Sequence, residues 1–222
     1  MPSPTDFNLS PYFDDFTESK KFHRVLFRPA FAVQARELTQ SQTQLQNQIE
    51  KVSDHLFEKG AMVIPGEIGY DLNYYAVKLT SIASANTLAQ FTTDTVLTGG
   101  SSGVKARIIG TDALSGSDPD TLYVKYNDSG TNNTNTAFAH GETITGTNSD
   151  SVALSAVVAT CHTGSAAQVE EGTYYINGYH VQVSKQTIVL DKYTNNPSYR
   201  VGLLVTESFV TPNDDTTLND NA

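Results

Sequence analysis

The chain has 222 residues, of which 38% are hydrophobic and 17% charged, so it can bury a core in one or two domains and is not a disordered chain. Its net charge of −10 argues against a sequence-independent nucleic-acid binder, which needs a basic surface, and makes DNA and anionic membranes poor partners. The single cysteine, Cys161, excludes an intrachain disulfide framework and fits assembly in a reducing cytoplasm.

Residues 1–29 are predicted to form an extended arm. They lack the basic and apolar parts of a signal peptide, and no run in the chain approaches the roughly 18 apolar residues of a membrane-spanning helix, so we expect a soluble protein made without Sec-type export. Aromatic side chains on an arm without its own core must bury against the same protein or a neighbour. The arm's aromatic residues are Phe7, Tyr12, Phe13, Phe16, Phe22 and Phe27.

Residues 30–60 are predicted to form a coiled-coil helix. Apolar residues recur in alternating steps of four and three, which is the a/d pattern of a heptad repeat, and Pro29 and Gly60 suit the start and end of a helix. Because the stripe is confined to a and d, it is narrower than that of a helix on a globular core, and a second copy is the expected partner. The predicted seam is Phe31, Ala35, Leu38, Gln42, Leu45, Ile49, Val52 and Leu56.

Two questions about this helix stay open at the level of sequence. It could instead lie on its own domain, although Gln42 at an a position favours an oligomer whose register is fixed at some cost in stability. The number of chains is also undetermined. Ile49 at a with Leu45 at d favours a dimer, whereas Leu56 at a with Val52 at d departs from that pattern.

The rest of the chain is predicted to be β, with antiparallel sandwich or barrel domains. Residues 61–83 and 164–210 are assigned to one β domain, with an inserted β module at 84–163 and a tail or linker to further chain at 211–222. The run "AMVIPGEIGYDLNYYAVKLTSI" reads as one or two short strands broken at Pro65-Gly66. Asn177-Gly178 between two β-rich runs predicts a hairpin with a type I′ turn, and "YRVGLLVTESFV" predicts a further strand.

Metal and cofactor signals are weak. The five histidines have no metal-ligand spacing, and Cys161-His162 cannot alone complete a zinc site, so we expect neither a metal nor a cofactor. The glycine-rich stretch "TGGSSGVKA" lacks the spacing of a phosphate-binding loop and a following helix, and a hairpin loop explains it better.

The sequence also lacks a convincing catalytic constellation. The neighbouring carboxylates Asp14-Asp15 and Glu170-Glu171 would point to opposite faces of a strand, so solvated surface is the favoured interpretation and no catalytic residue is assigned. Cys161 is better explained as a half-buried strand thiol than as a nucleophile. Five tyrosines could form a sugar-stacking platform, but cross-strand packing explains them as well. They are Tyr174, Tyr175, Tyr179, Tyr193 and Tyr199.

The N-terminal region resembles a family of virion structural proteins of tailed phages, especially cyanophage-type myoviruses. The resemblance covers residues 7–66, with "PYFDDF", "FHRVLFRP", "QARELTQ" and "LQNQIE" in order, and resumes in "GTYYINGYHVQVSKQTIVLDKY" and "DDTTLNDNA". The family is similar to baseplate and tail-fibre connector proteins, which are long homotrimers anchored in the particle through their N-terminal part. In the family, sequences like "TLNDNA" are usually followed by further chain.

The resemblance implies a structural, non-enzymatic homotrimer of the phage tail, made in the host cytoplasm and assembled with other baseplate or tail-fibre proteins. The arm would dock to the particle, the coiled coil would set the copy number, and the β body would present or connect a fibre. Two alternatives remain: an adhesin whose β module binds a host glycan, and a polysaccharide depolymerase. The depolymerase would need convergent carboxylates that the sequence does not locate.

Overall fold

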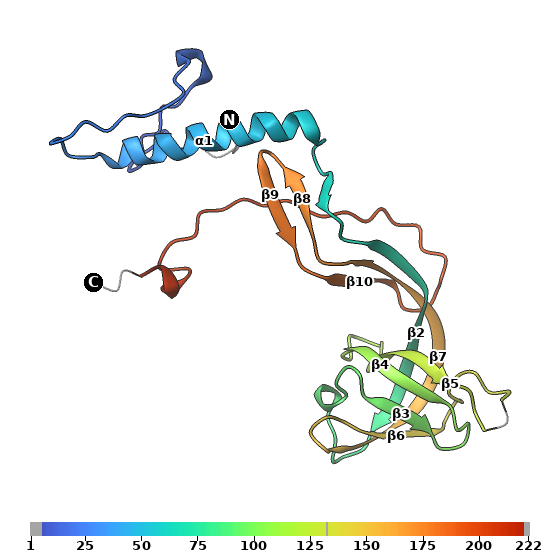
Figure 1. Ribbon diagram of the computed structural model, residues 1–222. Helices are drawn as coiled ribbons and strands as arrows, with labels where there is room; N and C mark the ends of the chain where they lie inside the picture. Colours follow the sequence, from blue (N-terminus) through green and yellow to red (C-terminus); the bar gives the residue numbers. More distant parts are fainter. Residues whose placement is uncertain (1–5, 132, 220–222) are drawn as a thin grey trace. The chain divides into compact units, whose positions relative to one another are not determined.

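The computed structural model describes residues 6–131 and 133–219, and its fold is mostly β with one helix near the N-terminus and two antiparallel sheets (Figure 1). This confirms the predicted mostly-β class with an N-terminal helix. The chain divides into two compact units. Unit 1 joins the chain up to residue 66 with residues 170–184 and the chain from residue 201, and unit 2 consists of residues 67–169 and 185–200. Among the described residues, no helix is both long and apolar enough to cross a membrane.

Unit 1 contains the helix and a small sheet. Its elements are η1 (Glu18–Lys20), α1 (Ala35–Leu56), β1 (Met62–Ile64), β8 (Gly172–Ile176), β9 (Tyr179–Val183) and η3 (Thr216–Leu218). The sheet has the order β1-β8-β9. Asn177 and Gly178 have φ angles of 48° and 88° and join two antiparallel strands that pair Ile176 with Tyr179. Positive φ at both central positions is the requirement of a type I′ turn, so the predicted hairpin is confirmed.

The helix is shorter than the predicted residues 30–60. It begins at Ala35 because Gln34 caps it, with the Gln34 N–H donating to the Glu37 carboxylate at 2.9 Å. It ends at Leu56 because Phe57 adopts an extended backbone, and the Phe57 ring lies 6.0 Å from that of Tyr175. Phe31 therefore lies outside the helix.

Unit 2 is built on one seven-stranded sheet. Its strands are β2 (Ile68–Ile82), β3 (Val96–Gly99), β4 (Lys105–Asp112), β5 (Thr121–Asp128), β6 (Thr143–Thr147), β7 (Ala153–Val169) and β10 (Gln186–Asp191), with η2 (Leu88–Gln90) between β2 and β3. The order is β10-β7-β2-β5-β4-β3-β6, and β6 also pairs with β7. Strands from the expected inserted module thus share one sheet with β2 from its N-terminal flank and β10 from its C-terminal flank, and β7 itself runs across the expected boundary at residue 163. The two expected strands around Pro65-Gly66 are β1 and β2, although β2 spans 15 residues and is not short.

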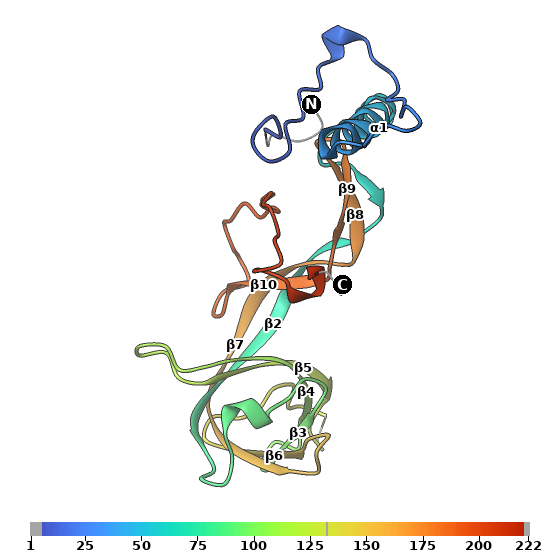
Figure 2. The same cartoon turned by 90° about the vertical axis from the view of Figure 1, so that its left-hand side faces the viewer.

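The sheet of unit 2 is nearly ring-closed, but it is not the barrel that was one of the predicted forms. Figure 1 and Figure 2 show β3 to β6 curling around one end of the long β2–β7 pair. β2 and β7 continue beyond the ring, and irregular registers between β2 and β7 and between β4 and β5 interrupt uniform pairing. The ring encloses a core of buried apolar side chains. These are Val77, Leu79, Phe91, Leu97, Val104, Ala106, Ile108, Leu122, Val124, Phe138, Ile144, Leu154, Ala156 and Val158.

The strand predicted in "YRVGLLVTESFV" does not form. Residues 201–210 have no regular secondary structure, and every one of them is exposed. Alternating apolar residues make a strand only when a neighbouring strand supplies cross-strand contacts, so the sequence pattern alone was insufficient here.

Candidate functional site

The candidate site is the apolar stripe of α1, which the chain leaves uncovered. All eight predicted seam residues are exposed, including Phe31 before the helix and the polar Gln42 within it. Leu45, Val52 and Leu56 are 67%, 62% and 66% exposed. In contrast, the buried side chains of α1 are polar: Gln44, Asn47 and Ser53. A water-soluble helix normally shows the reverse arrangement, with its apolar stripe covered.

The side of α1 opposite the seam binds the N-terminal arm through polar groups. Arm carboxylates contact a second helical stripe, with Asp15 at 2.9 Å from the Arg36 guanidinium and Glu18 at 3.0 Å from the Lys51 ammonium. Because each residue turns an α-helix by about 100°, this stripe lies on the far side from the seam. The helix residues of the stripe are Arg36, Gln40, Thr43, Asn47 and Lys51, which contact Asp14, Asp15 or Glu18.

The C-terminal half of α1, again away from the seam, holds the β8–β9 hairpin. The Gln46 side-chain amide donates to the Gly178 carbonyl at 2.6 Å, and the Tyr175 hydroxyl donates to the carboxylate of Asp54. Burial, together with that hydrogen bond and the nearby carboxylates, raises the pKa of Tyr175 to about 12. A side chain at Gly178 would approach Glu50 within 3.1 Å of its Cβ. The glutamine-rich surface of the helix thus binds partners within its own chain.

The arm carboxylates are not the solvated surface that was predicted for Asp14-Asp15. Asp14 is 7% exposed, and its carboxylate accepts from the Thr43 hydroxyl and, at 3.1 Å, from the Phe16 N–H. Hydrogen bonding from Lys20, helped by Arg36, lowers the pKa of Asp15. The prediction was wrong because these carboxylates find partners on a helix more than twenty residues away. The sequence did carry a signal for this contact: the polar residues of the stripe recur along α1 in steps of four, three, four and four, which places them on one side of the helix.

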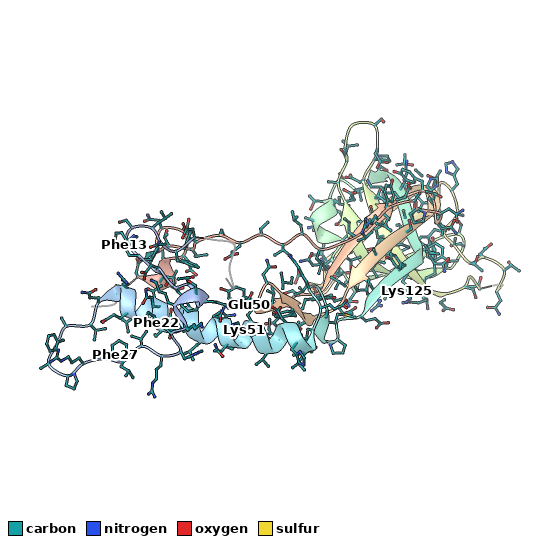
Figure 3. The ribbon with its side chains drawn as sticks, turned by 90° about the horizontal axis from the view of Figure 1, so that it is seen from above. Phe13, Phe22, Phe27, Glu50, Lys51 and Lys125 are labelled. Carbon is teal, nitrogen blue, oxygen red and sulfur yellow. The ribbon has the colours of Figure 1, made fainter. Side chains whose placement is uncertain are left out.

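The six arm aromatics divide into two groups. Phe7 and Tyr12 contact Phe209, with ring centroids 5.7 and 6.0 Å apart, so part of the arm packs on the C-terminal segment of unit 1. Phe7 and Phe16 are half-buried. Phe13, Phe22 and Phe27, labelled in Figure 3, are exposed and remain available to a neighbour.

We expect Asp14→Ala to loosen the arm from the helix. The change removes a charged acceptor from the Thr43 hydroxyl and the acceptor of the Phe16 N–H, and the loss of hydrogen bonds to a charged group typically lowers stability by about 1–3 kcal/mol. Trypsin should then cut at Lys20, Lys21 and Arg24 several-fold faster than in the wild-type chain. Asp6→Ala, an exposed aspartate of the same arm, is the matched control. Equal cleavage rates in both variants would contradict the docking role of Asp14.

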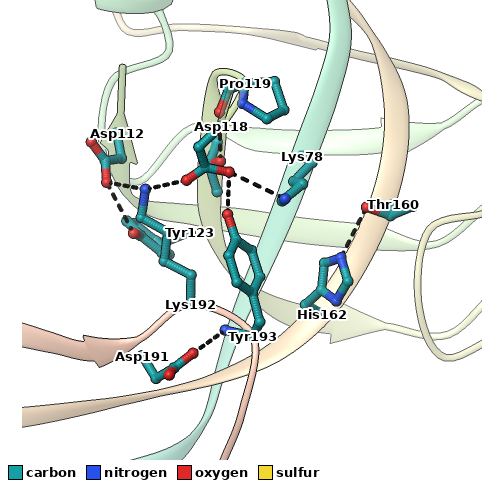
Figure 4. Close-up of polar contacts among 11 residues, drawn as sticks. Lys78, Asp112, Asp118, Pro119, Tyr123, Thr160, His162, Asp191, Lys192 and Tyr193 are labelled. Atoms are coloured by element: carbon teal, nitrogen blue, oxygen red, sulfur yellow. Dashed lines mark hydrogen bonds and ion pairs between the residues drawn. The ribbon is translucent and has the colours of Figure 1, made fainter. Parts of the chain in front are cut away.

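Unit 2 carries a cluster of paired charges around Lys192. The Lys192 ammonium lies 2.7 Å from Asp112 and 2.8 Å from Asp118, while Lys78 lies 3.1 Å from Asp118 (Figure 4). The hydrogen bonds from Lys192 and Tyr193 hold the pKa of Asp118 well below its usual range. A general acid needs a raised pKa, so the cluster is unsuited to acid catalysis. Its ion pairs and hydrogen bonds instead hold Lys192 and Tyr193, the residues that follow β10.

The tyrosines considered for sugar stacking are mostly engaged elsewhere. Tyr174 and Tyr175 are buried in unit 1, and the Lys78 ammonium lies 4.1 Å from the ring centroid of Tyr193 in unit 2. Tyr179 and Tyr199 are exposed. Neither unit gathers these residues into an open platform.

The glycine-rich loop of unit 2 binds a carboxylate of its own chain. It joins the antiparallel strands β3 and β4, as the hairpin interpretation predicted. The Ser101 and Ser102 N–H groups donate to one oxygen of Glu142 at 3.1 and 2.9 Å, and the Ala139 N–H donates to the other at 2.5 Å. Burial opposes the charged form of Glu142, but these hydrogen bonds prevail and lower its pKa. A Cβ on Gly99 would lie 2.7 Å from the carboxylate, so a side chain at this position would displace Glu142 from the loop.

Other candidate groups do not assemble into a reactive centre. Cys161 is half-buried, and burial raises the pKa of its thiol, which disfavours the nucleophilic thiolate. Within residues 6–131 and 133–219, no three His, Cys, Asp or Glu side chains are grouped to hold a metal ion.

Comparisons with protein-family models, with curated proteins and with solved structures find no match to this chain. The exposed seam of α1, with its polar sides occupied by the arm and the hairpin, is therefore the feature from which function is argued.

Proposed function

We propose that this chain is a structural component of a phage tail, a baseplate or tail-fibre connector protein that oligomerises through α1 and anchors in the particle through its N-terminal region. The observation that carries the proposal is the uncovered seam. Its a/d spacing suits a coiled coil, and none of its eight residues is buried by its own chain.

The energetics of the helix support association. Completing the burial of a half-exposed Leu, Ile or Val stabilises by roughly 1–2 kcal/mol, so five such residues provide several kcal/mol of gross stabilisation for a helix partner. The polar sides of α1 are already bound to the arm and the hairpin. The seam is therefore the side left for another helix, and a copy of α1 offers the matching spacing.

The homotrimer and the position in a phage tail come from the sequence resemblance of residues 7–66 and not from the heptads. The arm fits an anchoring role because three of its aromatic side chains, Phe13, Phe22 and Phe27, remain exposed while its carboxylates fix it to α1. Exposed aromatic residues on a tethered arm can bury against a neighbouring baseplate protein. Gln42 at a central a position suits a seam that must set register.

The two other functions have less support. A glycan-binding adhesin would use tyrosines gathered on an open face, but Tyr174 and Tyr175 are buried and the Lys78 ammonium lies over the ring of Tyr193. A depolymerase would need an acid and a base, whereas Asp112 and Asp118 are neutralised by Lys192 and Glu142 is held ionised by the glycine-rich loop.

The position in the particle is tested by quantitative mass spectrometry of purified phage that encodes this chain, with tails separated from heads. We expect the chain in the tail fraction, in a copy number divisible by three, retained through washing at high salt. Its absence from washed particles, or its presence only with heads, would reject the proposed function.

A further inference from the structure

Residues 201–206 have a strand-like sequence but lie outside every strand. They read VGLLVT, which is rich in residues that favour strands, and every one of the six is exposed. Within the part of the chain that the structure describes, no backbone N–H or carbonyl of these residues hydrogen-bonds to another backbone group. Farther on, the Phe209 ring contacts those of Phe7 and Tyr12. The segment is therefore tethered to unit 1 while its own hydrogen-bonding groups stay open.

Strand β9 offers an open edge in the same unit. It is the last strand of the β1-β8-β9 sheet, and among the described residues it pairs with β8 alone. In an antiparallel ladder, two paired residues either hydrogen-bond to each other or both point their N–H and carbonyl groups outward. Tyr175 of β8 hydrogen-bonds to the chain just before β1, so its β9 partner His180 points outward, and so does Gln182 two residues on. These groups can receive another strand.

β9 lacks the features that keep an edge strand from pairing. Proteins protect such edges with charged residues, prolines, bulges or very short strands. At the other edge of this sheet, β1 has three residues and an irregular register, and Pro65 follows directly after it. β9 has five residues, YHVQV, in an uninterrupted register, with no lysine, acidic residue or proline among them. Of the two edges, β9 is the one suited to receive a strand.

Segment 201–206 of another copy fits this edge. The segment and β9 have similar lengths, and neither contains Asp, Glu, Lys or Arg, so they can approach without like-charge repulsion in a chain of net charge −10. Within a single chain both lie in unit 1, yet they remain unpaired. The α1 seam also lies in unit 1. Association through the seam would bring these regions of different copies together at an effective concentration that favours pairing of short strands.

We propose that residues 201–206 of one copy add as a strand to the outer edge of β9 in a neighbouring copy. The inference rests on the proposed function, because it requires copies that the α1 seam holds together. Strand addition gains affinity from main-chain hydrogen bonds, and alternate side chains gain contacts across the new pair. Tyr179 and Val181 of β9 are 38% and 40% exposed and would acquire such neighbours. The strand-like segment thus finds the partner that its own chain does not supply.

Hydrogen–deuterium exchange of the full chain, read by mass spectrometry, tests the pairing. We expect the amides of residues 201–206, and the outward amides of His180 and Gln182, to be protected in the assembled wild type. Their exchange should be roughly tenfold or more slower than in Leu45→Asp, in which the seam is broken. Slow exchange of both segments in monomeric Leu45→Asp would show that one chain pairs with itself, which would overturn the exchange between copies.

Proline substitutions in the segment supply the matched variants. Leu203→Pro combined with Leu204→Pro removes two adjacent N–H groups, one of which must face β9 whatever the register. Both positions are exposed and outside every strand in the single chain, so its fold should be retained. We expect the double variant to lose the protection of His180 and Gln182. Ser208→Pro, in the same exposed segment but beyond the proposed strand, should keep that protection.

The outcomes separate this inference from the proposed function. If wild type assembles through the seam but residues 201–206 and β9 exchange as fast as in Leu45→Asp, strand addition is rejected and the seam stands. Strand addition is also rejected if the double proline variant keeps wild-type protection. A wild-type chain that is monomeric at every concentration rejects both proposals. Protection that requires the seam and the N–H groups of residues 203 and 204 supports the inference.

Discussion

Replacing Leu45 by aspartate is expected to dissociate the oligomer at concentrations where the wild-type chain is assembled. Leu45 is 67% exposed in the single chain, so the substitution disturbs little within it. In the assembled seam, the aspartates of neighbouring copies would meet in a desolvated d layer. An unpaired charge in such a site typically costs about 3 kcal/mol or more, which weakens association more than a hundredfold.

Gln48→Asp is the matched control for Leu45→Asp. Gln48 is exposed on the same helix at a g position, which borders the a/d stripe without belonging to it, so its charge lies at the solvated edge of the seam. Both variants should retain the circular dichroism of the folded chain. A Leu45→Asp protein that sediments as the wild-type oligomer would show that the seam does not hold the copies together.

The largest effect on folding is expected from Glu142→Gln. Both carboxylate oxygens of Glu142 accept backbone N–H groups, from Ser101 and Ser102 on one side and from Ala139 on the other. Glutamine has only one oxygen, so its NH₂ group must face one set of N–H donors. Loss of charge-assisted hydrogen bonds in a buried site lowers the free energy of unfolding by about 2–3 kcal/mol, which lowers the melting temperature by roughly 5–10 °C.

The effect of Glu142 should also depend on pH. Because folding lowers the pKa of Glu142 below the ordinary value of 4.5, its contribution is present above that value and is lost as the pH falls through the folded-state pKa. The stability gap between wild type and Glu142→Gln should therefore be constant near neutral pH and shrink in acid. Glu67→Gln, at an exposed glutamate of unit 2, should match wild type throughout. A Glu142→Gln chain that melts with wild type would contradict the role of the loop.

Local signals in the sequence predicted the elements that depend on nearby residues. The heptad spacing identified the helix, and Asn177-Gly178 identified the β8–β9 hairpin because positive φ at two adjacent positions strongly favours those residues. The narrow apolar a/d stripe also predicted the seam of α1, which the structure leaves exposed. The sequence misplaced both ends of the helix because each end depends on a particular contact. Gln34 caps the start through Glu37, and Phe57, just after the last residue, packs near Tyr175, which is far along the chain.

Long-range polar contacts could not be read from the sequence. Asp14 and Asp15 looked like surface carboxylates, yet their partners lie on α1, and the glycine-rich loop found its anion in Glu142, about forty residues away. The nearly closed ring likewise depends on β6 returning to β7, a pairing set by the fold as a whole. Residues 201–210 show the converse, since a strand-like pattern remained without a strand partner.

The most direct test of the account is the mass of the wild-type chain in solution, measured by sedimentation equilibrium at several concentrations. A single chain has a mass of 24.1 kDa. The account predicts a species of three times that mass that survives dilution into the low micromolar range and high salt, because an apolar seam is little affected by ionic screening. A mass of 24.1 kDa at every concentration would contradict it.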